Sequence, residues 1–416
     1  MAHVRPIKAS FLISSEFKAD PHPFYARMRE EAPVFAISAP FLLRRIAKTT
    51  SVGAAFSQAW LITRYDDVAA MLKDERLSRD ILARLPRFPR FFRPLLDNML
   101  GREPPDHTRL RKLISKAFTP RRIEQLSGQI EGVCEELLAK APSGRPFDLV
   151  ADYALPLPLT IISELLGVPR SERQRFHHLL HGCLTLGLPT GRLLDFVRAV
   201  PSFWLLTRYF RRLFAERRLR PRDDLFSALV QAEEAGDRLN SDELLGTAIL
   251  LLFAGYETTV HLIASGTLAL LQHPEESARF TQDPSLAESA IEELLRYTSP
   301  LVVTTPRLTT EEVTYALVTI PKGALVLGVL ASANHDESQF VDPERLDLGR
   351  EPNKHLAFGT GHHFCLGASL ARLEARIALA ALFRRRPAIR LAQPAESLRW
   401  RRSLALRALA ALPVTF

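Results

Sequence analysis

The residues whose types and spacing are best suited to chemistry surround Cys365. The ten residues from Phe358 to Gly367 read FGTGHHFCLG, and a strongly helical pattern begins at Ala368. Glycine permits backbone conformations and close approaches that a Cβ atom forbids, so a bulky planar ligand could lie against this segment. A thiolate at the start of a helix is stabilised by the helix dipole and by unpaired N–H groups. The segment therefore predicts a metal-binding sulfur; the alternative is an ordinary buried cysteine in a glycine-rich turn.

A second candidate lies in the middle of a long apolar run. The stretch from Ala254 to Thr259 reads AGYETT and places the carboxyl of Glu257 beside the hydroxyl of Thr258. A buried carboxylate costs energy unless it is paired or neutralised, and a mid-helix threonine can bond a preceding carbonyl and loosen the helix. This pair is therefore either a functional acid and hydroxyl or a satisfied polar kink.

The segment around Cys365 resembles the haem-binding loop of the cytochrome P450 family. The family pattern is Phe, two residues, Gly, three residues, Cys, one residue, Gly, often with His two residues before the Cys, and every position matches. The resemblance implies that Cys365 is the axial ligand of the iron of haem b. It implies further cofactor contacts from the same loop, namely Phe358, Gly359, His363 and Gly367. A single thiolate ligand leaves the opposite face of the iron open for dioxygen and favours O–O cleavage.

The stretch around Glu257 resembles the oxygen-binding segment of the same family, which reads Ala or Gly, Gly, any residue, Asp or Glu, Thr. The resemblance implies that Ala254 and Gly255 leave room beside the haem. It also implies that Thr258 holds protons near bound dioxygen while Glu257 relays them from solvent. Proton delivery is the step that allows the O–O bond to cleave.

Haem carries two propionates, which need cationic donors, preferably the fork of an arginine. The segment PPDHTRLR resembles the family's propionate-binding helix start, with His107 and Arg111 four residues apart on one helix face. Arg307 and His363 match the family's other propionate ligands, whereas Glu103 replaces the more usual Asp. For each residue alone, the alternative is a solvated surface charge.

The family also carries Glu-x-x-Arg followed by a later Pro-x-Arg turn. Glu293, Arg296 and Arg345 match these positions, and the resemblance implies a structural network, not a catalytic one. Leu346 stands where the family usually has an aromatic residue. We leave His355 and His362 as surface residues without a role.

Helical periodicity dominates the elements that must position these residues. Apolar residues recur at helical spacing in five long segments: Arg121 to Ala139, Pro158 to Leu166, Ser241 to Gln272, Ala287 to Tyr297 and Ala368 to Phe383. Strand-like stretches are few: Ala59 to Thr63, Val302 to Val329 and Leu412 to Phe416. We predict a mainly α-helical fold with small β-sheets (α+β). The resemblance places the haem between the long central helix and the helix after Cys365.

The longest predicted helix starts at Ser241 as N-cap and ends before His273. At about 1.5 Å per residue it is long enough to span a bilayer. Glu257 at its middle would be costly inside a membrane, so we predict a helix through the centre of the protein instead.

No linker or internal repeat divides the chain, which we predict to be one domain over residues 1–416. Residues 39–58 form an apolar and basic stretch without a counterpart that we recognise in the family. This stretch is either an insertion that touches a membrane surface or a lid over the substrate channel.

The charge of the chain points to no particular partner. The formal net charge is +9, but lysines and arginines are spread along the sequence and no nucleic-acid motif accompanies them. An acidic partner protein explains the charge as well. The first residues carry no apolar core followed by a cleavage site, and three scattered cysteines form no disulfide framework. We therefore expect a cytoplasmic protein that binds no nucleic acid and has no transmembrane span.

The resemblance implies a monooxygenase that uses dioxygen and two electrons derived from NAD(P)H. No flavin or dinucleotide fingerprint follows a strand, so we expect a separate ferredoxin or flavodoxin with its reductase. The basic side chains of Arg109, Lys112, Lys116 and Arg372 could dock this partner. We expect a monomer.

Two alternatives keep the haem: a peroxide-driven peroxygenase or dehydratase, and a haem-binding sensor or electron carrier that performs no oxygenation. The intact pair of Glu257 and Thr258 favours the use of dioxygen. The substrate pocket is expected to draw on four largely apolar stretches: Leu77 to Met99, Phe176 to Phe214, Leu250 to Ala254 and Leu301 to Thr305. An apolar small molecule is implied, such as a lipid, terpenoid, steroid or polyketide-like compound that is hydroxylated or epoxidised.

Overall fold

The computed structural model describes residues 6–38, 58–81, 92–116, 118–142, 144–187, 193–234 and 239–416. The predicted insertion or lid at 39–58 lies outside the described residues except for Gln58. Much of the predicted substrate loop from Leu77 to Met99 also lies outside them.

The chain divides into two compact units. Unit 1 contains Met1–Ser78, Ser127–Leu157 and Glu257–Phe416, and unit 2 contains Arg79–Leu126 and Pro158–Tyr256. The prediction of a single domain over the whole chain stays a prediction.

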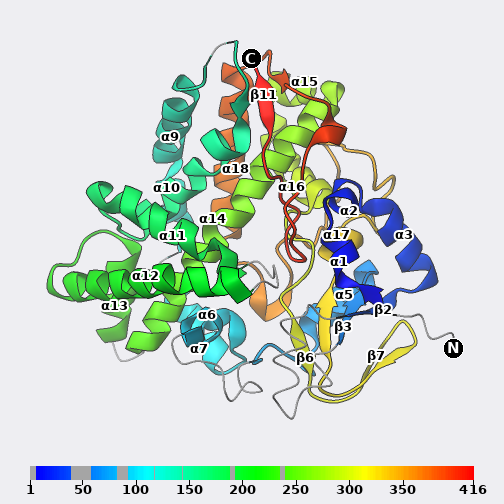
Figure 1. The fold of residues 1–416 in the computed structure, drawn as a ribbon, viewed down its shortest axis with the longest axis horizontal. Coiled ribbons are helices and arrows are strands. Elements are labelled where there is room, and N and C mark those ends of the chain that lie inside the picture. The colour runs from blue at the N-terminus through cyan, green and yellow to red at the C-terminus, as the bar shows by residue number, and fades with distance from the viewer. Residues whose placement is uncertain are drawn as a thin grey trace. The chain divides into compact units, whose positions relative to one another are not determined.

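Helices are the main regular elements of both units, as predicted (Figure 1). The helices of unit 1 are α1 (Ala9–Leu12), α2 (Ser15–Ala19), α3 (His22–Glu31), α5 (Tyr65–Lys73), α9 (Ser127–Ala139), α15 (Pro274–Gln282), α16 (Ala287–Thr298), α17 (Leu330–Ala333) and α18 (Ala368–Arg385). Those of unit 2 are α6 (Arg93–Leu96), α7 (Asp106–Ser115), α8 (Pro120–Glu124), α11 (Arg173–Gly187), α12 (Leu193–Leu219) and α13 (Leu225–Glu234). Two helices run from one unit into the other, α10 (Pro156–Leu165) and α14 (Ser241–Gln272).

The strands are short and belong to unit 1. A six-stranded sheet has the order β1-β2-β3-β9-β6-β4, and two smaller sheets have the orders β10-β11-β5 and β7-β8. Their bounds are β1 (Ile7–Lys8), β2 (Val34–Ser38), β3 (Gln58–Ile62), β4 (Leu77–Ser78), β5 (Phe147–Asp148), β6 (Arg307–Thr309), β7 (Val313–Tyr315), β8 (Val318–Ile320), β9 (Leu325–Gly328), β10 (Arg390–Leu391) and β11 (Pro413–Thr415). The three predicted strand regions supply β3, β6 to β9 and β11, which confirms a helical protein with small sheets.

The long helix α14 runs from Ser241 to Gln272, as the periodicity predicts. It is the one helix among the described residues that is long and apolar enough to cross a membrane, with a mean hydropathy of 1.4 over its most apolar window. However, 67% of that window is buried inside the protein. This burial agrees with a helix through the protein core.

The start of α14 differs by one residue from the prediction. The side-chain oxygen of Asn240 accepts hydrogen bonds from the backbone N–H groups of Asp242 at 3.0 Å and Glu243 at 2.9 Å. Glu243 accepts in turn from the N–H of Asn240 at 2.9 Å. Asn240, not Ser241, is therefore the N-cap, because an amide oxygen here completes a reciprocal capping box.

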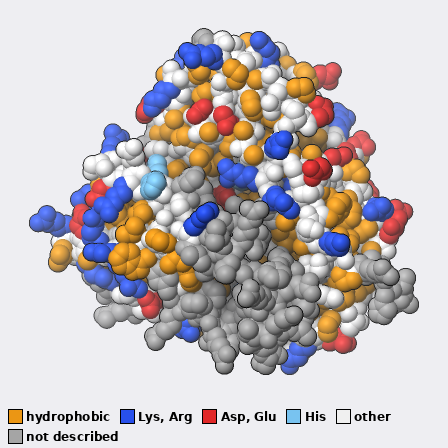
Figure 2. All heavy atoms as spheres, in the orientation of Figure 1, with side chains coloured by type: hydrophobic (Ala, Val, Ile, Leu, Met, Phe, Trp, Pro, Cys, Tyr) orange, Lys and Arg blue, Asp and Glu red, His pale blue; other side chains and the backbone are white. Residues whose placement is uncertain are grey.

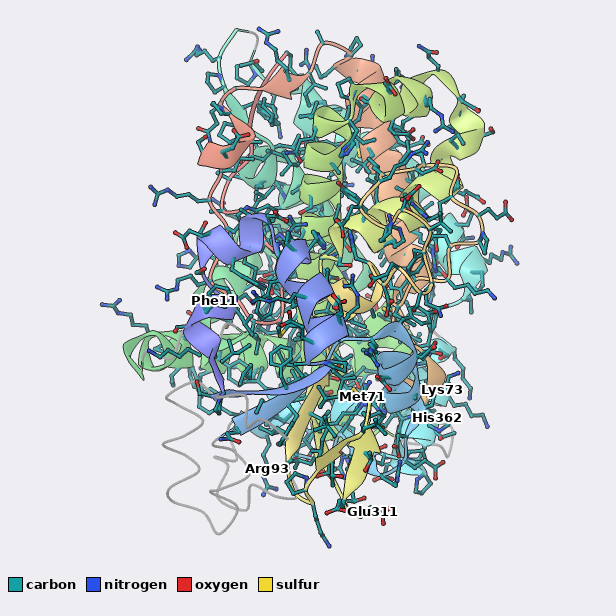
Figure 3. The ribbon with its side chains drawn as sticks, turned by 90° about the vertical axis from the view of Figure 1, so that its right-hand side faces the viewer. Phe11, Met71, Lys73, Arg93, Glu311 and His362 are labelled. Atoms are coloured by element: carbon teal, nitrogen blue, oxygen red, sulfur yellow. The ribbon has the colours of Figure 1, made fainter. Side chains whose placement is uncertain are left out.

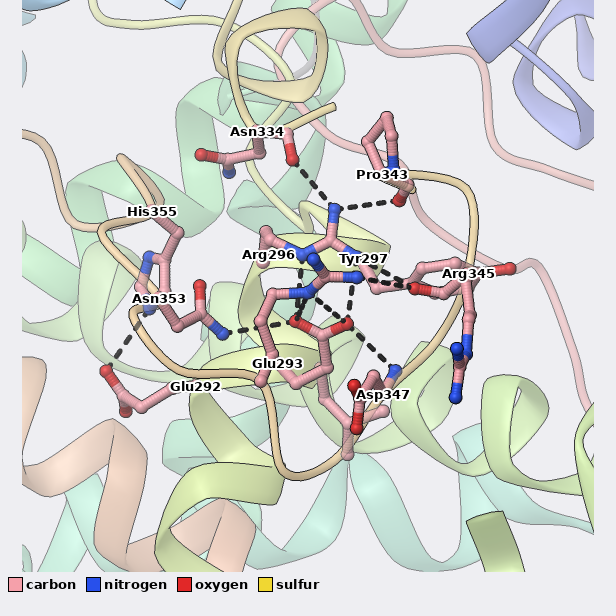
Figure 4. A network of polar contacts seen from close by, with 12 residues as sticks. Glu292, Glu293, Arg296, Tyr297, Asn334, Pro343, Arg345, Asp347, Asn353 and His355 are labelled. Carbon is pink, nitrogen blue, oxygen red and sulfur yellow. Dashed lines mark hydrogen bonds and ion pairs between the residues drawn. The ribbon is translucent and has the colours of Figure 1, made fainter. Parts of the chain in front are cut away.

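Arg296 is at the centre of a buried polar network (Figure 4). Its Nε and Nη2 donate to the two carboxylate oxygens of Glu293, each at 2.8 Å, and both side chains are 0% exposed. The remaining N–H groups of Arg296 donate to the backbone carbonyls of Asn334, Pro343 and Arg345 at 2.8 to 3.2 Å. The network ties α16 to the loop that precedes the Cys365 segment.

The second arginine of this network differs from the prediction. Arg350 donates its Nε to Glu293 at 3.1 Å, whereas Arg345 has an exposed side chain and supplies only its carbonyl oxygen. Asn353 Nδ2 and the N–H of Asp347 also donate to Glu293, at 3.1 and 3.0 Å. The predicted network of Glu293, Arg296 and Arg345 is therefore present, but Arg345 joins it through its backbone carbonyl. The chain turns after Asp347 and brings the side chain of Arg350, instead of that of Arg345, back to the carboxylate.

A second buried carboxyl, Glu374, lies on α18, which packs against α9. Glu374 is 1% exposed, and its Oε2 has no hydrogen-bond partner among the described residues. Burial raises the pKa of Glu374 from 4.5 to about 8. The folded protein thus holds this proton more tightly than the unfolded chain does. The resulting stability is complete below about pH 4.5 and is lost as the pH rises through about 8.

We expect replacement of Glu374 by Gln to remove this pH dependence. Each pH unit between the folded and unfolded pKa corresponds to about 1.4 kcal/mol, so the wild-type protein should lose several kcal/mol between about pH 5 and about pH 9. The E374Q variant should lose clearly less free energy of unfolding in urea over that range. Glu288→Gln, at a side chain that is 84% exposed, is the control. Parallel curves for wild type and E374Q would contradict the expectation.

Candidate active site

The backbone before α18 presents the Cys365 sulfur at the surface of unit 1. Gly361–His363 form a short 3-10 turn, and the N–H of Cys365 donates to the carbonyl of Phe358 at 3.0 Å. Gly359 and Gly361 have φ angles of 67° and 75°, a left-handed conformation that side chains rarely adopt. Cys365 is exposed, whereas Cys134 and Cys183 are buried. The thiol is therefore accessible directly ahead of a helix N-terminus.

An ion pair that was not predicted from the sequence lies against the Cys365 loop. The guanidinium carbon of Arg372 lies 4.5 Å from the centroid of the Phe358 ring. Arg372 donates two hydrogen bonds to Glu292, at 2.6 and 2.7 Å, and His355 Nε2 lies 3.2 Å from the same carboxylate. Burial acts to raise the pKa of Glu292, but hydrogen bonds from Arg372 and His355 outweigh it and lower the pKa to about 2. His355 is thus a paired residue with 4% exposure, not a surface residue without a role.

Arg307 and the end of α5 lie beside the same loop. Arg307 is 3% exposed, and its two terminal nitrogens donate to the carbonyls of Met71 and Leu72 at 2.8 and 3.0 Å. A Cβ atom on Gly361 would lie 3.5 Å from the carbonyl oxygen of Leu72. Figure 3 shows Met71 and Lys73 of α5 near His362 of the loop. Unit 1 therefore brings Arg307 and the Cys365 loop onto the same end of α5.

The middle turn of α14 is less covered than the turns on either side. Ala254 is exposed, and Glu257 and Thr258 are half-buried, in a helix whose neighbouring turns are almost all buried. Burial raises the pKa of Glu257, while the charge of Arg401 acts to lower it. A Cβ atom on Gly255 would lie 3.1 Å from Ile162 Cδ1. Glycine at this position thus permits close packing of α14 on α10, besides any role toward a cofactor.

His107 and Arg111 lie on α7 in unit 2. His107 is 1% exposed and Arg111 is half-buried, and the two are one helical turn apart on the same side. A shallow depression beside them is lined by Pro104, Pro105, Thr108, Arg109 and Lys112. Arg109 forms an ion pair with Glu243 at the start of α14.

The predicted site residues thus divide between the units. Unit 1 holds Glu257, Thr258, Arg307, Phe358, Gly359, His363, Cys365 and Gly367, and unit 2 holds His107, Arg111, Ala254 and Gly255. The helix α14 is continuous through Ala254 to Thr258. Within unit 1, an accessible thiol ahead of a helix fits a metal-containing group that takes one sulfur ligand. Among the described residues, no atom beyond the chain neighbours lies within 4 Å of the position that a Cβ would take on Gly359 or Gly367, so the loop leaves space for such a group.

The comparisons with known proteins agree with this geometry. The family model described as Cytochrome P450 matches residues 204–386. The chain is 42% identical over 407 residues to the polyketide biosynthesis cytochrome P450 PksS of Bacillus subtilis, covering 96% of each chain. It is 40% identical over 416 residues to 6-deoxyerythronolide B hydroxylase of Saccharopolyspora erythraea, covering 97% of this chain and 98% of the relative. The solved structure of PksS superimposes with a TM-score of 0.87, covering 97% of this chain and 98% of the other.

The chain therefore belongs to the cytochrome P450 family. It has the fold of that family and is an oxidoreductase of the haem-dependent monooxygenase type. These results confirm the family, the fold class and the enzyme class expected from the motifs around Cys365 and Glu257.

Proposed function

We propose that the chain is a haem-thiolate monooxygenase that inserts one oxygen atom of dioxygen into an apolar small molecule, with electrons from a separate protein. The observation that carries the proposal is the exposed thiol of Cys365 directly ahead of α18. The pair of half-buried side chains of Glu257 and Thr258 on α14 supports the use of dioxygen.

Three groups of residues would hold the haem. Cys365 would bind the iron, and Phe358, Gly359 and Gly367 would lie against the ring. Ala254 and Gly255 would leave room for it on α14, and His107, Arg111, Arg307 and His363 would donate to the propionates. Bound haem supplies the iron at which dioxygen is reduced and its O–O bond cleaved, favoured by the thiolate.

Glu257 and Thr258 would control protons at this site. Because burial raises the pKa of Glu257, its carboxyl keeps a proton closer to neutral pH than an exposed glutamate does. A carboxyl with a raised pKa is better suited to proton transfer than an exposed one. The hydroxyl of Thr258, the next residue on α14, would hold the proton beside the bound dioxygen that takes it up.

The electrons must come from a partner. The reaction consumes substrate, dioxygen, two electrons and two protons, and yields an oxygenated product and water. A ferredoxin or flavodoxin with its NAD(P)H-dependent reductase would supply the electrons.

In Figure 2, lysine and arginine side chains are spread over the visible face among acidic and apolar ones.

The structure changes which basic residues are suited to test partner docking. Arg109 is paired with Glu243, and Arg372 is paired with Glu292 and stacks on Phe358. Replacing either arginine would disturb the site as well as the surface. Lys112 and Lys116 on and after α7 are exposed and better suited.

We expect the double variant with Lys112→Gln and Lys116→Gln to be reduced several-fold more slowly by an acidic ferredoxin at low salt. The difference should shrink as added salt screens the charges. Stopped-flow reduction of the holoenzyme measures this rate, and Lys140→Gln, an exposed lysine on unit 1, is the control. An unchanged rate at low salt would exclude docking at these lysines.

For the substrate, we propose a polyketide-like or fatty acyl compound. Unit 2 contains a cluster of buried aromatic side chains from α11 and α12, including Phe176, Phe210 and Phe214, and apolar surroundings favour apolar ligands. The names of the relatives PksS and 6-deoxyerythronolide B hydroxylase place those proteins in polyketide chemistry. We also propose that the chain acts in the cytoplasm as a monomer.

Isotope labelling tests the proposed reaction. The holoenzyme, with a surrogate ferredoxin, its reductase and NADPH, is incubated with 6-deoxyerythronolide B or a saturated fourteen-carbon fatty acid under heavy-isotope dioxygen. We expect a product that carries one heavy oxygen atom. A product formed only with added peroxide would instead favour the peroxygenase alternative, and haem reduction without any product from a broad apolar panel would favour an electron carrier or sensor.

A further inference from the structure

A buried histidine lies one helical turn after Glu257 on α14. His261 is 1% exposed, and neither of its ring nitrogens has a hydrogen-bond partner among the described residues. Leaving a buried polar group without a partner costs about 1–3 kcal/mol. Buried groups of this kind almost always bond to the protein or to an ordered water. A water at His261 is therefore expected.

His261 and Glu257 lie on the same face of α14. Residues four apart on a helix are neighbours, with Cβ atoms about 5–6 Å apart. Both side chains belong to unit 1, and the charge of one residue, Arg401, acts on both. A water bonded to His261 would thus also lie within reach of the Glu257 carboxyl.

The charge of Arg401 acts on this buried face, and Arg401 itself is partly exposed. It lies in a C-terminal hairpin in which the N–H of Arg401 donates to the carbonyl of Ala408 at 2.8 Å and Trp400 pairs with Leu409. Arg401 is only half-buried, whereas His261 is fully buried. One helical turn further along α14, Ser265 is only 4% exposed. Solvent therefore does not reach His261 from that side.

The imidazole of His261 is suited to take part in proton transfer while it stays neutral. Burial, followed by the charge of Arg401, lowers the pKa of His261 to about 3. At neutral pH the ring therefore has one N–H donor and one nitrogen acceptor. A ring in this state can accept a hydrogen bond from one water and donate to another.

We propose that His261 and Arg401 are positioning residues that hold ordered water beside the Glu257 carboxyl and connect it with solvent at the C-terminal hairpin. This inference rests on the proposed function, because the ordered water would supply the protons that Glu257 relays. His261 itself acts only through Glu257 and the water.

The first test is structural and needs no turnover. A high-resolution crystal structure of the holoenzyme should show a water within hydrogen-bond distance of a ring nitrogen of His261 and on the side of Glu257. The His261→Leu variant should lose this water without a shift of α14. If both ring nitrogens instead bond to protein groups and no water is present, the proposal is wrong.

The second test follows the fate of dioxygen without any substrate. With NADH, a plant-type ferredoxin and its reductase, dioxygen takes two electrons and two protons to give peroxide, or four of each to give two waters. Poor proton delivery favours peroxide, so the ratio of NADH to dioxygen consumed falls from two toward one. We expect His261→Leu to raise the peroxide formed per dioxygen at least twofold. His261→Asn, which keeps a hydrogen-bonding group, should restore most of the wild-type ratio.

Two further variants distinguish an error in the role of His261 from an error in the proposed proton route through Glu257. Ser265→Ala removes a buried hydroxyl at the same spacing from His261, on the side away from Glu257, and should leave the ratio unchanged. Glu257→Gln should raise peroxide if the proposed function is right. A raised ratio in Glu257→Gln with no change in His261→Leu would overturn the role of His261 alone, whereas no change in either variant would overturn the proton route of the proposed function.

Discussion

Replacing Arg296 with Met should lower the free energy of unfolding by about 3–5 kcal/mol, because it leaves the Glu293 carboxylate buried without its main partner. Glu293 is 0% exposed and receives two 2.8 Å hydrogen bonds from Arg296. The variant also removes the guanidinium donor from the backbone carbonyls of Asn334 and Pro343, whereas the carbonyl of Arg345 keeps a hydrogen bond from Arg350. Arg350 stays bonded to Glu293, which should keep the loss near the lower end of that range.

Urea unfolding of the holoenzyme measures this loss. Arg345→Met is a matched control, because Arg345 belongs to the same network but contributes only its backbone carbonyl. The control should differ from wild type by less than about 0.5 kcal/mol. If R296M lost less than about 1 kcal/mol, or if R345M lost as much, the network in Figure 4 would not be the one that stabilises the protein.

Replacing Thr258 with Ala should separate electron consumption from product formation. The hydroxyl would hold the proton that O–O cleavage requires, and positioned proton transfer contributes about a hundredfold or more to rate. We therefore expect NADPH consumption within about twofold of wild type, with product yield at least tenfold lower and the missing electrons recovered as peroxide. Thr258→Ser, which keeps a hydroxyl at the same place, is the matched control and should retain much of the yield.

The same variant distinguishes the peroxygenase alternative. An enzyme driven by added peroxide does not depend on proton delivery to dioxygen in the same way, so Thr258→Ala should leave its yield nearly unchanged. Equal product yield in wild type and T258A with dioxygen and NADPH would contradict the role proposed for the hydroxyl.

Local motifs explain what the sequence predicted well. The Cys365 loop and the start of α18 lie within a few residues of one another, and glycine spacing and helical periodicity are properties of such short windows. The long run from Ser241 to Gln272 is periodic over many turns, so its extent was also predictable. Only its N-cap was misplaced, although the Asn240 and Glu243 pair is a recognisable capping box.

Contacts between distant segments explain what was missed. Glu292 and Arg372 are 80 residues apart in sequence, and Glu293 and Arg350 are 57 apart. Neither spacing leaves a periodic signal, and one turn of the chain decided whether Arg345 or Arg350 reached the carboxylate. His261 lies just after the Ala254–Thr259 motif but is not part of it. Its importance comes from burial and from the charge of Arg401, which is 140 residues away in sequence.

The central claim is that Cys365 binds a haem iron as a thiolate. The most direct test is the absorption spectrum of the purified protein after reduction with dithionite and exposure to carbon monoxide, with Cys365→Ser measured beside it. We predict that the wild-type Soret band moves to the long wavelength characteristic of thiolate ligation and that the variant lacks this band. A wild-type band at the shorter wavelength of other ligands, or no haem spectrum at all, would contradict the account.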